Sequence, residues 1–127
     1  MLAEKLARTP RKEVILFVHG INTAFKNDVV VMAPLWHFMD RFGVPVVYGW
    51  PAGRGGLRGY ATDRESGEFT VFHLKQFLRA LADCPDVERI HVIAHSRGTD
   101  VILTALRELT EYYRGAGRRP GRALKLD

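Results

Sequence analysis

The chain has 127 residues, of which 46% are hydrophobic and 26% are charged, a composition typical of a single α/β domain with a sizeable core. No apolar run approaches the roughly 18 residues of a membrane span, so the sequence excludes one. Cys84 is the only cysteine, which excludes an intrachain disulfide and a cysteine-based metal site. The first 13 residues contain no apolar segment of signal-peptide type, and we expect a cytoplasmic protein.

The formal net charge of +5 comes from the two ends of the chain. Residues 114–127 carry five basic and one acidic residue, whereas residues 14–113 carry ten basic and eleven acidic residues. The C-terminal basic residues stand among glycine and proline, with no aromatic residue after Tyr113 to stack on bases. We therefore interpret residues 115–122 as a solvated basic linker and expect no nucleic-acid partner.

Three short apolar runs predict strands, at residues 14–18, 44–48 and 88–94. Their β-branched residues follow one another almost without polar interruption, which is the pattern of parallel strands buried on both faces. Residues 1–12 precede the first run as an N-terminal arm. Residues 123–127 look like the beginning of a further strand.

Helical patterns alternate with these runs, with apolar residues at spacings of three and four. The first covers about residues 28–42 and ends at Gly43. The second follows a glycine-rich segment, residues 52–59, and ends at the Cys-Pro-Asp turn that begins at Cys84. The candidate N-terminal caps are Asn27 or Asp28 for the first helix and Asp63 or Ser66 for the second.

This alternation predicts the α/β class, a mainly parallel sheet with helices on both faces, in a single domain over residues 1–127. In such sheets the ligand site lies beyond the C-terminal ends of the strands. His19, Trp50 and Ser96 all fall at those ends.

Ser96 lies where the third strand turns directly into a third helix. Ala94 and Gly98 stand two residues on either side, where a nucleophile elbow (G-x-S-x-G) needs small side chains, although the first glycine is alanine here. An elbow predicts a positive φ at the serine. The alternative is that Ser96 is a helix N-cap, a position that serine also favours.

Four motifs occur in chain order. They are His19-Gly20-Ile21-Asn22-Thr23, Tyr48-Gly49-Trp50-Pro51, Gly59-Tyr60-x-x-Asp63-Arg64-x-Ser66 and Ala94-His95-Ser96-x-Gly98-Thr99. Together they span most of the chain and resemble the α/β-hydrolase fold, more narrowly an uncharacterised bacterial branch of esterase- or lipase-like serine hydrolases. The resemblance implies that strand 14–18 lies between the other two.

The resemblance also implies the roles of particular residues. Ser96 is the expected nucleophile toward a small-molecule ester or related acyl substrate, through an acyl-enzyme and without a cofactor. The expected oxyanion hole uses the backbone N–H of Arg97 and that of Ile21 or Asn22. Further residues can line the substrate pocket, namely His19, Trp50, Tyr60 and Asp63. Tyr60 and Asp63 can equally order the glycine-rich loop and cap the helix after it.

The sequence departs from the family pattern after the elbow. In that fold the catalytic acid and then a histidine follow the nucleophile, and no histidine follows Ser96 here. The chain therefore resembles the N-terminal half of a hydrolase domain, and we expect residues 1–127 to be a partial one. A non-catalytic α/β module that keeps the elbow only for packing is the second interpretation, and a small-molecule binder using the glycine-rich loop is the third.

Metal-binding patterns are missing from the sequence. There is no His-Glu-x-x-His motif, no Cys-x-x-Cys pair and no cluster of carboxylates with ligand spacing. We therefore expect no metal site.

Overall fold

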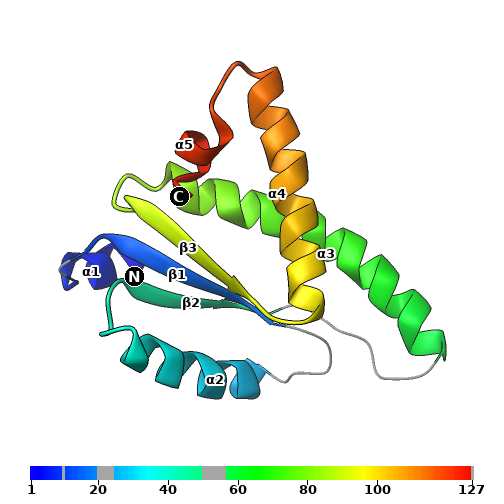
Figure 1. The fold of residues 1–127 in the computed structure, drawn as a ribbon, viewed down its shortest axis with the longest axis horizontal. Coiled ribbons are helices and arrows are strands. Elements are labelled where there is room, and N and C mark those ends of the chain that lie inside the picture. Colours follow the sequence, from blue (N-terminus) through cyan, green and yellow to red (C-terminus); the bar gives the residue numbers. More distant parts are fainter. Residues whose placement is uncertain (10, 20–24, 50–56, 127) are drawn as a thin grey trace.

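A computed structural model describes the backbone of residues 1–9, 11–19, 25–49 and 57–126, and the side chains of these residues apart from 25–28 and 57–67 (Figure 1). Three strands alternate with helices along the chain. The strands are β1 (Glu13–Val18), β2 (Val44–Tyr48) and β3 (Arg89–Ala94). The helices are α1 (Leu2–Ala7), α2 (Phe25–Phe38), α3 (Leu57–Asp83), α4 (Arg97–Gly115) and α5 (Pro120–Leu124).

The three strands form one parallel sheet in the order β2-β1-β3. This confirms the predicted α/β class and the central position of β1. Every residue of β1 is buried, as its uninterrupted apolar run predicts for a strand covered on both faces.

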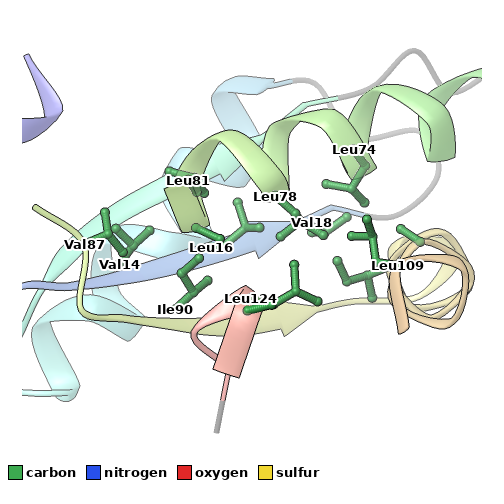
Figure 2. Packing of buried hydrophobic residues seen from close by; sticks show 14 of the residues in the cluster. Val14, Leu16, Val18, Leu74, Leu78, Leu81, Val87, Ile90, Leu109 and Leu124 are labelled. Atoms are coloured by element: carbon green, nitrogen blue, oxygen red, sulfur yellow. The ribbon is translucent and has the colours of Figure 1, made fainter. Parts of the chain in front are cut away.

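Successive side chains of β1 point to opposite faces of the sheet, and each face has its own hydrophobic cluster. Val14, Leu16 and Val18 pack against α3 and α4, as Figure 2 shows for Leu74, Leu78 and Leu81 of α3 and Leu109 of α4. On the other face, Ile15 and Phe17 pack with Met32 of α2. Helices therefore cover both faces, and β1 is the centre of the core.

The first long helix lies about three residues earlier than the sequence predicts. α2 already includes Asn27 and Asp28, so neither is its N-cap, and it ends at Phe38 instead of near residue 42. Asp40 and Arg41 follow in a left-handed conformation, with φ of 58° and 52°, which stops the helix. The indole N–H of Trp36 donates to the carbonyl of Phe42 at 3.2 Å and holds the turn in place.

The second long helix begins earlier than expected. α3 starts at Leu57, so residues 57–59 of the predicted glycine-rich loop are helical, and Asp63 and Ser66 lie inside the helix rather than capping it. Glycine lowers helix stability by about 1 kcal/mol relative to alanine without breaking a helix. The glycines near the start of α3 therefore did not mark a helix boundary.

Both ends of the chain carry short helices. Residues 2–7 of the expected arm form α1, in which Leu6 is 1% exposed and belongs to the core. α5 occupies residues 120–124, across the end of the expected linker and the start of the expected strand. Its first residue is a proline, which favours a helix start, and Lys125 with φ of 54° ends it. Leu126 then forms an isolated parallel bridge with Ile90 of β3.

A buried carboxylate joins β1 to β3 at their N-terminal ends. Glu13 is 7% exposed, and its carboxylate lies 3.3 Å from His91, 3.6 Å from Arg11 and 3.8 Å from Arg89. His91 is therefore part of this polar cluster, on the strand that leads to Ser96.

Candidate active site

The C-terminal ends of the three strands lie in one layer. Val18 is in register with Tyr48 on one side and with Ala94 on the other. The chain leaves the sheet just after each of these residues, at His19 after β1 and at Ser96 after β3. The register therefore brings these strand ends together, as the parallel-sheet prediction requires.

Ser96 joins β3 to α4 in a strained backbone conformation. Its φ is 55° and its ψ is −126°, a combination of backbone angles that residues other than glycine rarely adopt. The predicted positive φ is confirmed. The neighbouring backbone is fixed by two hydrogen bonds, from His95 N–H to the Val18 carbonyl at 3.2 Å and from Thr99 N–H to the Ser96 carbonyl at 3.0 Å.

The Ser96 side chain makes no capping hydrogen bond, although the residue occupies the N-cap position of α4. A serine chosen as a cap accepts a bond from the backbone N–H two or three residues later. Ser96 does not, and the residue is exposed at the surface. The elbow therefore describes this serine better than the cap does.

Gly98 allows α4 to start against the end of β1. A β-carbon at this position would lie 2.3 Å from the His19 carbonyl oxygen and 2.5 Å from the Val18 carbonyl oxygen. Both obstacles are backbone atoms, which cannot rotate away. The second glycine of the elbow motif is thus required by a close contact between the elbow and the strand end that carries His19.

Arg97 is the first residue of α4, and its guanidinium lies 3.8 Å from the carboxylate of Asp100. The Asp100 side chain is 74% exposed, so water screens the pair. The N-terminus of α4 adds a partial positive charge beside Ser96, which favours an anion there. Of the proposed oxyanion donors, only Arg97 belongs to the described residues, because Ile21 and Asn22 lie outside them.

His19 is 2% exposed directly after β1, next to the elbow. His95 is exposed, beside Ser96 in the sequence. Trp50 lies outside the described residues, and Tyr60 and Asp63 lie in the N-terminal half of α3. Their expected roles in a substrate pocket remain predictions.

Tyr48 is a residue at this end of the sheet that the sequence did not single out as a site residue. Its ring lies 5.4 Å from that of Phe77 on α3, and burial raises the pKa of its phenol above the ordinary value. The signal that could have found it is its place as the last residue of a strand, opposite Val18.

The described residues contain no group of three or more His, Cys, Asp or Glu side chains that could hold a metal ion. None of their helices is both long and apolar enough to cross a membrane.

Comparison with known proteins gives one match. The model of a family described as an alpha/beta hydrolase of unknown function (DUF900) matches residues 1–118. The chain belongs to this family. No curated protein and no solved structure matches the chain.

Membership of DUF900 agrees with the fold that the strand order shows, and it identifies the chain as part of an alpha/beta hydrolase family. The description of the family indicates hydrolase activity in general. In this DUF900 chain, the strained serine stands where the sheet and the elbow helix meet.

Proposed function

We propose that this protein is a serine hydrolase of ester or related acyl bonds, with Ser96 as its nucleophile. One observation carries the proposal. Ser96 is exposed, follows β3 next to the central strand β1, and has a φ of 55°. Strained backbone of this kind is costly and persists only where the surrounding structure holds it in place. It is found most often at functional sites. Family membership supplies the reaction class.

In the proposed mechanism the Ser96 hydroxyl attacks the substrate carbonyl carbon and loses its proton to a general base. The carbonyl oxygen becomes an oxyanion, which accepts hydrogen bonds from the Arg97 N–H and from that of Ile21 or Asn22. The carbonyl then re-forms, the leaving oxygen takes the proton back from the base and departs as an alcohol, and the acyl group stays on Ser96. Water releases it as a carboxylic acid in a second round of the same steps.

A serine hydroxyl is a weak nucleophile without an adjacent base. No histidine follows Ser96 in these 127 residues, and the hydrolase order expects the base there. We therefore expect residues 1–127 alone to hydrolyse an activated ester such as p-nitrophenyl acetate slowly. The full-length natural protein, whatever further sequence it has, is expected to hydrolyse it readily.

The decisive experiment uses Ser96→Ala in the full-length protein. Loss of the nucleophile is expected to leave only the acceleration due to the oxyanion hole and to substrate binding, about 10³–10⁴ over water in other serine hydrolases. A fluorophosphonate probe should label Ser96 in the wild type. Ser66 is the one other serine among these 127 residues, so Ser66→Ala, still labelled, is the matched control.

The competing interpretation is a non-catalytic module in which the elbow serves packing alone. The close approach of Gly98 to the His19 carbonyl supports this interpretation, since packing alone then accounts for a glycine at this position and no catalytic role is needed. Unchanged turnover in Ser96→Ala, or a probe bound at a different residue, would reject Ser96 as the nucleophile and favour the module.

A further inference from the structure

Three arginines surround one shallow hollow near the C-terminal end of the chain. The hollow has a volume of ≈ 620 Å³ and is lined by Arg118, Arg119, Arg122 and Ala123. Among the described residues, its lining contains no carboxylate and none of the three guanidinium groups forms an ion pair. It lies beside the start of β3, where Leu126 bridges Ile90, so it is at the opposite end of that strand from Ser96.

The backbone that carries these arginines is folded. The Arg118 N–H donates to the Tyr113 carbonyl at 2.8 Å, and the Ala123 N–H donates to the Arg119 carbonyl at 2.9 Å. Ala123 and Leu124 are buried and attach α5 to the core, beside the C-terminal part of α4 (Figure 1). The backbone that carries the arginines is therefore ordered rather than part of a solvated linker, and a ligand does not have to order it.

One of the three side chains is also packed. The Arg118 guanidinium lies 5.1 Å from the ring centroid of Tyr113, which is 2% exposed. Such a contact limits the rotamers of a long side chain and does not use up its N–H donors.

A neighbouring hollow of ≈ 350 Å³ shares Arg122 but differs in charge. Its lining includes Glu88, and Lys125 on its wall donates to the Cys84 and Val87 carbonyls. Arg89, on the same wall, lies 3.8 Å from Glu13. Because Lys125 and Arg89 already have acceptors and Glu88 adds a negative charge, an anion is favoured in the three-arginine hollow.

We infer that the hollow formed by Arg118, Arg119 and Arg122 binds a phosphate group carried by a small ligand. A tetrahedral phosphate dianion offers oxygens to several guanidinium groups at once, and each group can donate two N–H bonds. A single planar carboxylate has one negative charge and is satisfied by one guanidinium group. Three arginines without a carboxylate among them therefore match phosphate better. The site is independent of the proposed chemistry at Ser96.

The surroundings favour a small ligand over a nucleic acid. Residues 14–113 have one more acidic than basic residue, so the body of the protein carries no net positive charge to attract a polyanion. Tyr113, the nearest aromatic residue in the sequence, is buried under Arg118 and cannot stack on a base.

The test is a titration of the 15N-labelled protein with inorganic phosphate and with pyrophosphate, followed by NMR. We expect saturable shifts confined to residues 118–123, tighter for pyrophosphate. Arg119→Gln and Arg122→Gln are each expected to weaken pyrophosphate binding about tenfold, the loss of one charge-assisted pair. Arg107→Gln, an exposed arginine of α4 outside the hollow, is the matched control and should change binding less than twofold.

Circular dichroism of each variant shows whether it is folded, and a folded variant that has lost binding supports the site. Shifts that do not saturate, or an equal loss in Arg107→Gln, would mean that the arginines act only as general surface charge and would overturn the proposal. A 12-base-pair DNA duplex is the second arm. If it binds the same residues more tightly than pyrophosphate does, the ligand is a nucleic acid and the small-ligand proposal is wrong.

Discussion

Gly98 is the residue on which the geometry of the elbow depends most. The space for its β-carbon is occupied by the carbonyl oxygens of Val18 and His19, so a larger residue must push α4 away from β1. The strain at Ser96 is maintained by this contact, because it fixes the start of the helix immediately after the serine.

We therefore predict that Gly98→Ala lowers the free energy of unfolding by about 1–3 kcal/mol, the range for overpacking in a dense interior. Thermal and urea unfolding measure the effect. Gly115→Ala is the control, since nothing lies within 4 Å of a β-carbon there, and it should be neutral or stabilising by up to about 1 kcal/mol. Equal stability of the two variants would contradict the close packing of the elbow.

Tyr48 makes stability depend on pH in the alkaline range. Burial disfavours the charged phenolate, so the pKa of Tyr48 is higher in the folded protein than in the unfolded chain. The folded state thus holds the proton more tightly. Its advantage is fully present below the unfolded pKa of about 10 and is lost as pH rises from there through the folded pKa.

The prediction is that Tyr48→Phe removes part of the loss of stability above about pH 10, because phenylalanine has no proton to release. Urea unfolding between pH 8 and 11.5 measures it. Tyr112→Phe, at a tyrosine that is 52% exposed, should retain the alkaline loss of the wild type. The same alkaline curve for Tyr48→Phe and the wild type would show that Tyr48 is not the responsible group.

At the scale of elements, Lys125 ties α5 to the rest of the fold. Its ammonium group donates to the carbonyl of Cys84 at 2.8 Å and to that of Val87, where α3 ends and β3 is about to begin. Its own carbonyl accepts from the Ile90 N–H at 2.8 Å. One residue thus connects the end of α3, the start of β3 and α5.

Lys125→Met keeps the aliphatic chain and removes both side-chain bonds. Bonds from charged donors contribute about 1.5–3 kcal/mol each when buried, and Lys125 is half-buried, so we expect a total loss of about 1–3 kcal/mol. Hydrogen exchange at Ile90 should become faster. Lys5→Met, at an exposed lysine of α1, is the control. Unchanged exchange at Ile90 would show that α5 is held by its apolar contacts alone.

The strands could be predicted from the sequence more reliably than the ends of the helices. An uninterrupted apolar run such as β1 is a local signal of a buried parallel strand. The end of α2 depends instead on left-handed backbone at Asp40 and Arg41, which no local rule assigns to an arginine. The sequence predicts a linker where α5 begins, because arginine, glycine and proline are typical of loops, whereas the burial of Leu124 favours a helix packed on the core.

Some residues of the two proposed sites could be predicted from the sequence and others could not. Ser96 could be found because a strand and a helix meet at it in the sequence. Tyr48 and the three-arginine hollow could not, because the first depends on strand register and the second on the folding of α5. The reason for Gly98 also needed the structure, since its obstacle comes from residues almost 80 positions earlier.

In the molecule as a whole, the two proposed sites lie apart. The strained serine stands beyond the C-terminal strand ends, and the arginine hollow stands near the start of β3. α4 runs from the elbow toward the segment that carries the arginines, so it connects the two regions without lining the hollow (Figure 1). Variants at one site can therefore be compared with variants at the other as controls for global stability.

The central position of β1 also has a consequence for biosynthesis. Glu13 pairs in register with Arg89, which the ribosome adds about 75 residues later. At about 5–20 residues per second, this delay lasts roughly 4–15 s. β1 is the most apolar segment of the sheet, and during that interval the edge that will receive β3 has no partner from its own chain. The nascent protein is therefore exposed to misassociation for seconds, at the segment that later becomes its best protected part.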